Sequence, residues 1–272
     1  MPPGGFEDCM TTEDIWYRMQ RRVPPVVSEY FRGGADAEIT LHANVRAFQQ
    51  SFVNAEGATH FEAVDTSTTV LDHRIQLPWY ITPVGSLRTL YPKAEAVAAK
   101  VAGQFGTVMG LSTLSGTPME EVAQASSNSC WFQLYLCGGR ETALRGIARA
   151  KKAGFTALVL TIDTSVSGQR LVHARMKPLE AMRSWEGLTL QQKLQSLRRI
   201  ISLAPQMLPR LNWLLDFYAD HGVMEFVNII DAEGKPMPFT DIGSQLAESA
   251  ITWSDLEWIK QAWGSDQPLI VK

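Results

Sequence analysis

Hydrophobic residues along this chain gather into short continuous runs, several of which end in polar residues. Continuous apolar runs are typical of strands that are covered on both faces, as the strands of parallel sheets are. Because the loops after the strands form the active-site face of a (β/α) barrel, polar residues at these ends indicate an enzyme. The runs lie at residues 78–83, 108–113, 131–135, 157–164 and 268–272.

Helical patterns lie between these runs. We expect helices over residues 95–105, 119–125 and 141–153. The second starts after Pro118, and Gly154 closes the third. Strands and helices that alternate at a spacing of roughly 25 residues are βαβ units, which pair in parallel with right-handed crossovers. The sequence therefore predicts a parallel sheet covered by helices.

The N-terminal part of the chain predicts a helix over residues 13–30. Thr11 or Thr12 supplies the side-chain oxygen of its N-cap. The Pro24-Pro25 pair removes backbone donors within this stretch, so we expect it to break the helix in the middle.

Residues 169–252 interrupt the alternation of strands and helices. They contain no pattern of a buried strand, and offer helical patterns at 190–207 and 211–221 followed by a turn-rich stretch at 231–239. A structureless loop of this length is uncommon in a compact domain, so we interpret the segment as a helical excursion from the active-site face. Residues 253–263 then predict the helix that leads into the last strand.

The composition is that of one large soluble domain. Of the 272 residues, 45% are hydrophobic and 19% are charged. A net charge of -3 and a pI near 6.0 give no electrostatic footprint for nucleic acid. The cysteines, Cys9, Cys130 and Cys137, are too few and too scattered for a disulfide framework or a zinc site, which favours a reducing cytoplasm. The sequence predicts neither a secretory leader nor a membrane span.

Together these patterns predict an α/β fold of the (β/α)8 TIM-barrel type. We expect the barrel to be truncated after its fifth strand, with a helical insertion after strand four, in one incomplete domain over residues 1–272. Its parts are an N-terminal helical segment, barrel strands one to four, a helical insertion or lid, and a last helix with strand five. They cover residues 1–77, 78–168, 169–252 and 253–272 in that order.

Six segments carry motifs whose order and spacing are specific only when taken together. They lie at residues 30–35, 81–85, 111–113, 132–135, 160–164 with Gly168 and Arg170, and 269–272. In this order they resemble the FMN-dependent α-hydroxy acid dehydrogenases and oxidases, a family that includes glycolate oxidase, flavocytochrome b2 and the bacterial lactate and mandelate dehydrogenases. The resemblance runs from about residue 13 to the last residue and implies a bound FMN and no metal site.

The resemblance assigns four side chains to the flavin. Ser112, Gln133 and Thr161 match hydroxyl and amide groups that contact the ring. Lys272 matches a lysine whose positive charge, near N1 and O2, stabilises the anionic reduced ring. A serine or threonine at a strand end is alternatively a local cap, whereas an amide that points into a barrel has to find a partner.

The same resemblance assigns a backbone segment to the flavin near N5. It consists of Thr82, Pro83, Val84 and Gly85, and the glycine permits a close approach. Val84 departs from the threonine common at this position, but a backbone contact does not depend on that side chain.

Substrate binding is implied for three residues. Tyr30 and Tyr135 match two tyrosines, one on the substrate carboxylate and one on its hydroxyl, and Arg170 matches an arginine that assists the carboxylate through a bidentate pair. Tyr135 and Lys272 thus join Asp163 as the residues closest to the chemistry. In the family the aspartate orients a histidine that removes a proton from the substrate.

That histidine belongs to an Asn-His-Gly-Gly-Arg segment that follows the next strand, and these residues do not include it. We expect the histidines present to lie in loops or helices on the surface, where they cannot replace it. They are His42, His60, His73, His173 and His221.

The implied activity is FMN-dependent oxidation of a 2-hydroxy acid resembling lactate, mandelate or glycolate to the 2-oxo acid, with electrons passed to a quinone of the respiratory chain or to oxygen. Because no base is present, we expect this chain alone to be inactive. Two alternatives stay open: a truncated half-barrel that acts only through association, and a flavoenzyme that modifies a peptide-derived cofactor, with which the Cys-Gly-Gly-Arg segment at 137–140 is compatible.

The excursion at 190–218 mixes apolar, basic and aromatic residues at helical spacing. One interpretation is peripheral contact with the inner face of the cell membrane, as in the membrane-associated mandelate and lactate dehydrogenases. The other is a lid or an oligomer helix packed on the barrel, and a homo-oligomer is expected. We therefore expect a cytoplasmic protein, either free in the cytoplasm or bound peripherally at the inner face of the cell membrane.

Overall fold

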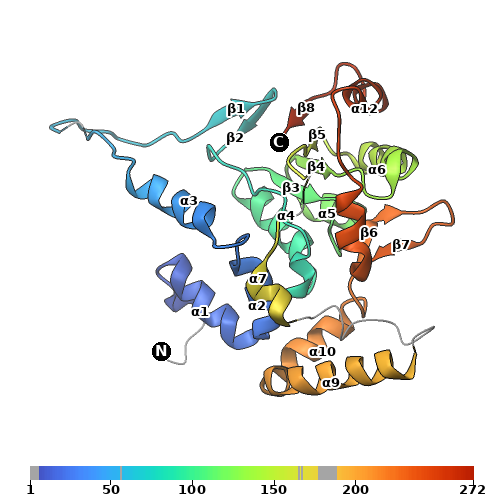
Figure 1. The fold of residues 1–272 in the computed structure, drawn as a ribbon. Coiled ribbons are helices and arrows are strands. Elements are labelled where there is room, and N and C mark those ends of the chain that lie inside the picture. Colours follow the sequence, from blue (N-terminus) through green and yellow to red (C-terminus); the bar gives the residue numbers. More distant parts are fainter. Residues whose placement is uncertain (1–5, 56, 165, 167, 177–188) are drawn as a thin grey trace. The chain divides into compact units, whose positions relative to one another are not determined.

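The computed structural model describes residues 6–55, 57–164, 166, 168–176 and 189–272. The chain divides into two compact units. One, the helical unit, comprises Met1–Ala55 and Gly168–Asp220. The other, the sheet unit, comprises Glu56–Ser167 and His221–Lys272. Figure 1 traces the chain through both, and each is described by itself.

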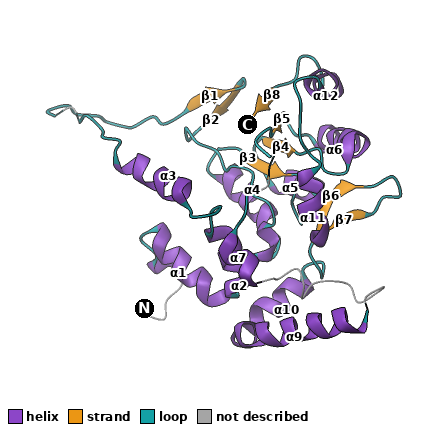
Figure 2. Ribbon diagram, in the orientation of Figure 1, coloured by secondary structure: helices purple, strands orange, loops and turns teal. Residues whose placement is uncertain are grey.

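The sheet unit is built around a parallel sheet in which sequence order and spatial order agree. Its strands, in sheet order, are β3 (Met109–Ser112), β4 (Cys130–Leu134), β5 (Ala157–Leu160) and β8 (Leu269–Val271). The helices that connect or flank them are α4 (Ala94–Gln104), α5 (Met119–Ala125), α6 (Gly139–Ala153), α11 (Ile242–Ala247) and α12 (Asp255–Trp263), shown in Figure 2. The predicted βαβ units are confirmed.

Both faces of this sheet are covered by apolar side chains. On the outer face Leu111, Phe132 and Leu158 pack with helical residues such as Ile147 of α6 and Ile259 of α12, all of them buried. Successive strand residues point to opposite faces, so their neighbours form a second layer on the inner face. That inner layer contains Ile75, Val108, Trp131, Ala157 and Val159. Two-sided burial is the reason why the strands appear in the sequence as continuous apolar runs.

The run at 78–83 does not form a strand, which corrects the prediction for the first barrel strand. Ile81 alone makes a parallel bridge to Met109. Its amide donates to Val108 O at 2.9 Å, and its carbonyl accepts from Gly110 N at 2.8 Å. The next amide that would continue this ladder belongs to Pro83, which has no N–H to donate.

Residues 221–252 contain a β-hairpin that the sequence pattern did not predict. β6 (Glu225–Ile230) pairs antiparallel with β7 (Pro236–Pro238). Asn228 interrupts the apolar run of β6 for a structural reason, because its side chain accepts from Met119 N at 2.9 Å and donates to Thr117 O at 3.1 Å. The amide therefore caps the start of α5, and the excursion is not helical throughout. A second unpredicted hairpin pairs β1 (Thr68–Val70) with β2 (His73–Ile75).

The helical unit contains no strand among its described residues. Its α-helices are α1 (Thr12–Arg22), α2 (Pro25–Arg32), α3 (Ile39–Gln49), α7 (Leu171–Met176), α9 (Leu190–Met207) and α10 (Leu211–Ala219). Thr11 caps α1 in a capping box with Asp14, and the break between α1 and α2 falls at the proline pair, as predicted. The short 3-10 helices of the chain are η1 (Phe6–Asp8), η2 (Leu87–Thr89), η3 (Leu208–Arg210) and η4 (Phe239–Asp241).

A small core holds the helical unit together. Val23, Val26, Leu203 and Trp213 are buried in it. Arg22 of α1 forms an ion pair with Asp216 of α10 at 2.5 Å, and Gln206 of α9 accepts from the first turn of α2 at 3.1 Å. Among the helices of the described residues, none combines the length and hydropathy that a membrane span requires.

Candidate active site

Polar side chains stand in a row at the carboxyl ends of neighbouring strands, on the inner face of the sheet. Ser112 ends β3, Gln133 lies near the end of β4, and Thr161 follows β5. Each is at most 3% exposed. Strand alternation places these three on the same face as the apolar layer of Trp131 and Val159, one step nearer the strand ends. We call them the polar row.

The side chains of the polar row bond to one another in a defined direction. Leu114 N donates to Ser112 Oγ at 3.1 Å, and Ser112 Oγ donates to Gln133 Oε1 at 3.0 Å. Thr113 N also donates to Gln133 Oε1, at 3.3 Å. A backbone N–H can only donate, so this contact fixes which end of the amide is the oxygen. Gln133 Nε2 consequently faces Thr161 and donates to its Oγ1 at 3.0 Å.

This direction leaves two donors unused. An amide has two N–H groups, and Gln133 Nε2 makes one bond in the part of the chain that the structure describes. Thr161 Oγ1 accepts that bond and has no acceptor for its own hydrogen among the described residues. Buried donors find acceptors in native structures. The row therefore fits a ligand edge that presents carbonyl oxygens.

A charged pair lies at the next strand end. Lys272 Nζ donates to Asp163 Oδ2 at 3.2 Å, with the two side chains 41% and 60% exposed. Their backbones extend the β5–β8 ladder, because Lys272 N donates to Leu160 O at 2.8 Å and Ile162 N donates to Lys272 O at 2.9 Å. The ammonium is thus held beside the polar row on the neighbouring strand.

The segment from Thr82 to Gly85 follows the Ile81 bridge and runs beside the loop after β3. A Cβ placed on Gly85 would lie 3.1 Å from Leu114 Cβ, tighter than nearly all such contacts, so glycine permits this approach. The next residue anchors the segment through a 2.8 Å bond from Ser86 N to Leu114 O. Thr82 and Val84 are exposed.

The predicted substrate residues lie in both units. In the sheet unit Tyr135 directly follows β4, and its amide donates to Thr113 Oγ1 at 3.1 Å. In the helical unit Tyr30 of α2 and Arg170 are brought together. The Arg170 guanidinium lies 4.8 Å from the centre of the Tyr30 ring and donates to the Tyr30 carbonyl oxygen.

The histidines are spread over other elements. His42 lies in α3, His173 in α7 and His60 in the loop before β1. His73 lies in strand β2, which corrects the expectation of loops or helices alone, and its ring is 3.4 Å from Ser129 Oγ. His221 begins the return into the sheet unit with a φ of 66°. No histidine follows a strand of the parallel sheet among the described residues.

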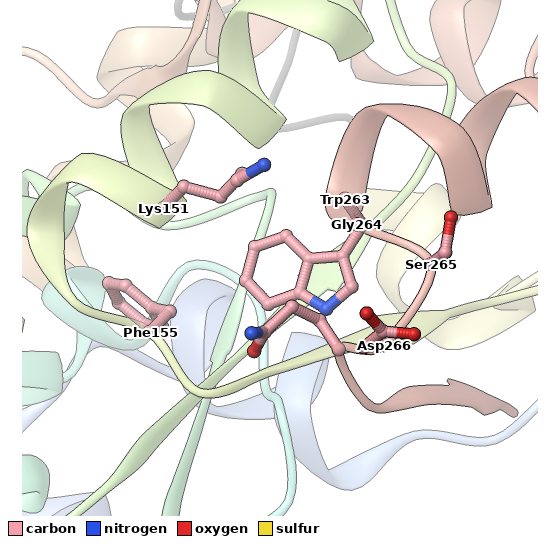
Figure 3. A pocket seen from close by; sticks show the side chains of 7 residues that line it. Lys151, Phe155, Trp263, Gly264, Ser265 and Asp266 are labelled. Atoms are coloured by element: carbon pink, nitrogen blue, oxygen red, sulfur yellow. The ribbon is translucent and has the colours of Figure 1, made fainter.

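A hollow of about 370 Å³ opens at the opposite ends of the strands, in the loops before β5 and β8 (Figure 3). Trp263 dominates its wall and donates from Nε1 to Pro268 O at 2.8 Å. In (β/α) barrels the active site lies at the carboxyl ends of the strands, so we do not assign the chemistry to this hollow. Its lining consists of Lys151, Phe155, Trp263, Gly264, Ser265, Asp266 and Gln267.

Sequence reasoning missed Thr113, which the structure places between the polar row and Tyr135. It is 3% exposed, and its hydroxyl contacts both Gln133 and Tyr135. Two signals in the sequence point to it: its place directly after Ser112 at a strand end, and its membership of the motif segment at 111–113.

Comparison with known proteins gives a consistent result. The chain matches the FMN-dependent dehydrogenase family over residues 19–272. Relatives named L-lactate dehydrogenase are 31% identical over 261 residues in Acinetobacter baumannii and 32% identical over 260 residues in Pseudomonas putida strain GB-1. Each alignment covers 93% of this chain and 62% of the relative, so the chain spans about three fifths of the length of the curated relatives it matches.

Solved structures give the same picture of the fold. A monotopic membrane protein, (S)-mandelate dehydrogenase, matches with a TM-score of 0.79 at 26% identity, over 97% of this chain and 66% of that one. A soluble mutant of the membrane-associated (S)-mandelate dehydrogenase from Pseudomonas putida matches with a TM-score of 0.67 at 25% identity, over 97% and 64%. The predicted fold class, an α/β fold of the (β/α) barrel type, is confirmed.

Proposed function

Because this chain belongs to the FMN-dependent dehydrogenase family, we propose that it supplies one side of the flavin site of an enzyme that oxidises a 2-hydroxy acid to the 2-oxo acid. The observation that carries the proposal is the bonded row from Ser112 through Gln133 to Thr161, with two unused donors beside the Lys272 ammonium. Lactate, mandelate and glycolate are the substrates we favour.

The residues present fit the ring of FMN. When bound, FMN accepts the two electrons that leave the substrate. The unused donors of Gln133 and Thr161 suit the carbonyl oxygens of its pyrimidine edge. Lys272 would stabilise negative charge on the same edge, and its bond to Asp163 would help to hold the ammonium in place. The backbone from Thr82 to Gly85 would contact the ring, and Gly85 would allow a close approach.

The substrate is held, in this proposal, by tyrosine and arginine side chains. Arg170 and Tyr30 bind its carboxylate, and the stacking observed within the helical unit supports their acting as a pair. Tyr135 bonds the substrate hydroxyl. Asp163 has one carboxylate oxygen on Lys272 and offers the other to a protonated base. The electrons then pass to a quinone or to oxygen.

A peripheral membrane contact is proposed for the helical unit. On α9 the buried Ser196 and Leu203 share one side, whereas a second apolar strip follows helical spacing on another side and is exposed. Basic residues of the same helix, at 193, 198 and 199, suit anionic headgroups. The alternative is that the helical unit forms a lid or an oligomer contact. The strip consists of Leu190, Leu194, Leu197 and Ile201 of α9, and Leu208 of η3 continues it.

A second candidate function is association through sheet edges. β8 pairs only with β5 in the described part of the chain, and Val271 of β8 is 44% exposed. Unpaired edges favour pairing with another chain. A half-barrel of this kind would act as a structural partner without flavin, so colourless purified protein that fails to bind added FMN supports this candidate.

The test measures flavin binding and oxidation separately. FMN is titrated into the 272-residue chain and followed by quenching of flavin fluorescence. Oxidation is followed with the same chain, alone and mixed with a separate chain that carries the last third of a lactate dehydrogenase relative. We expect binding in both samples, and lactate, mandelate or glycolate oxidation in the mixture only, because a base contributes about 100-fold to 10,000-fold. Absence of FMN binding from both samples would reject the proposal, and oxidation by the chain alone would show that the base is misplaced.

A further inference from the structure

Thr113 joins the ends of β3 and β4 through its side chain. Its hydroxyl donates to Gln133 O at 2.5 Å and accepts from Tyr135 N at 3.1 Å. The residue is 3% exposed. This buried hydroxyl therefore donates to Gln133 of β4 and accepts from Tyr135, which lies two positions further on and directly after the strand.

These contacts replace a step of the regular parallel ladder. In such a ladder the N–H of a residue donates to a carbonyl of the partner strand. The carbonyl of the same residue accepts from the N–H two positions further along that partner strand. Thr113 N does donate to Gln133 O, at 3.0 Å. The amide of Tyr135 then bonds to the Thr113 hydroxyl, at the point where β3 has ended at Ser112 and β4 at Leu134. The side chain thus carries the pairing one step past the strands.

The two residues held in this way, Gln133 and Tyr135, have different partners in the proposed function, namely the flavin and the substrate. In that function Gln133 would contact the flavin and Tyr135 the substrate hydroxyl. Thr113 N additionally donates to Gln133 Oε1 at 3.3 Å. We propose that Thr113 is a positioning residue that sets the flavin amide and the substrate tyrosine in one register. This inference rests on the proposed function.

The hydroxyl is what matters, because a valine of the same shape can neither donate nor accept. Thr113→Val leaves the Tyr135 amide without the hydroxyl that accepts its bond, whereas the Gln133 carbonyl keeps the bond from Thr113 N. Thr113→Ser keeps the hydroxyl and loses only a methyl group. The pair separates the hydrogen bonds from the packing.

A matched control lies at the start of the same strand. Thr107 precedes β3, is fully buried, and its hydroxyl also donates to a backbone carbonyl, that of Trp79. Thr107→Val removes a comparable bond far from the polar row. It should lower thermal stability without changing FMN affinity.

The experiment measures the Kd for FMN by fluorescence quenching, and the hydrogen exchange of the peptide spanning residues 134–138, in the wild type and in the three variants. We expect Thr113→Val to weaken FMN binding about tenfold and to speed exchange of the Tyr135 amide about tenfold. A tenfold change corresponds to about 1.4 kcal/mol, which is the order of one lost hydrogen bond. Thr113→Ser should stay within about threefold of the wild type in both, by the same reasoning.

Unchanged affinity and exchange in Thr113→Val would overturn the inference. So would a failure of Thr113→Ser to restore both values, since packing rather than the hydroxyl would then set the register. If the wild type binds no FMN either alone or in the mixture with the second chain, the proposed function fails first. In that case the exchange of the Tyr135 amide still decides whether the hydroxyl holds β4, and a result equal to the wild type rejects the inference on its own.

Discussion

The two units of this chain differ in what they bury. In the sheet unit the polar row is buried and bonded to itself, and apolar residues cover both faces of the sheet. In the helical unit the core is small, and Leu190, Ile201 and Leu208 are each more than 60% exposed. Buried polar groups persist only where each has a partner, whereas exposed apolar groups persist where something covers them. We interpret the first pattern as the cofactor site and the second as the contact surface of the proposed function.

The largest expected effect, a loss of oxidation rate, comes from replacing one paired aspartate in the sheet unit but not its counterpart in the helical unit. Asp163 and Asp216 are both partly exposed carboxylates paired with a cation, Lys272 and Arg22 respectively. We expect Asp163→Asn to slow 2-hydroxy acid oxidation by about 100-fold or more in the mixture of chains that turns over, because the base loses its orienting carboxylate. FMN affinity should stay within a few fold, since a pair this exposed contributes little.

Asp216→Asn is the control for this measurement. It removes an ion pair between α1 and α10 and should leave the steady-state rate unchanged. If Asp163→Asn lowered flavin binding and rate by the same factor, Asp163 would have a structural role instead. An equal loss of rate in both variants would remove the distinction between the units.

A smaller effect is expected on association with anionic vesicles. Replacing Leu194 and Ile201 by serine, both on the exposed strip of α9, should weaken vesicle binding about tenfold, because complete burial of one such side chain is worth roughly 1.5–3 kcal/mol. Val97→Ser on α4 is the control, since Val97 is 45% exposed in the sheet unit. Co-sedimentation that is equal for all three proteins would favour a lid or an oligomer contact for the helical unit.

The smallest effect concerns the cysteines. Cys9 of the helical unit is partly exposed, whereas Cys137 is buried and burial raises its pKa to about 12. A thiol whose pKa is raised on folding stays protonated, so any stability it contributes is lost only as the pH rises from about 9 toward 12. Iodoacetamide at pH 8 should therefore label Cys9 alone and leave FMN binding unchanged, as mass spectrometry can show. Labelling of Cys137 in folded protein would mean that the sheet unit opens.

Much of the sheet unit could be predicted from sequence because local signals agree there. The helix at 119–125 begins after Pro118 as expected, and the strand runs at 108–113, 131–135 and 268–272 fall within one residue of β3, β4 and β8. The run at 157–164 starts with β5 but continues four residues past its end at Leu160. The polar strand ends were found for the same reason, since a hydroxyl or amide that ends an apolar run stands out.

The failures have physical causes that no local pattern contains. Pro83 ends a ladder whose partner is distant in sequence, which an apolar run at 78–83 does not reveal. Asn228 interrupts the run of β6 because it caps a helix about a hundred residues away. Thr113 owes its role to the point at which two strands separate. In each case tertiary contacts decide what the residue does.

The central claim is that the amide of Gln133 binds the flavin ring, and its most direct test is an FMN titration of two glutamine variants. Gln133→Leu removes the unused donor and leaves Ser112 and Thr161 without their partner, so we expect FMN binding about tenfold to 100-fold weaker. Gln206→Leu removes a glutamine that bonds within the helical unit, and its Kd should equal that of the wild type. Equal FMN affinity in the wild type and both variants, with all three proteins folded, would contradict the account.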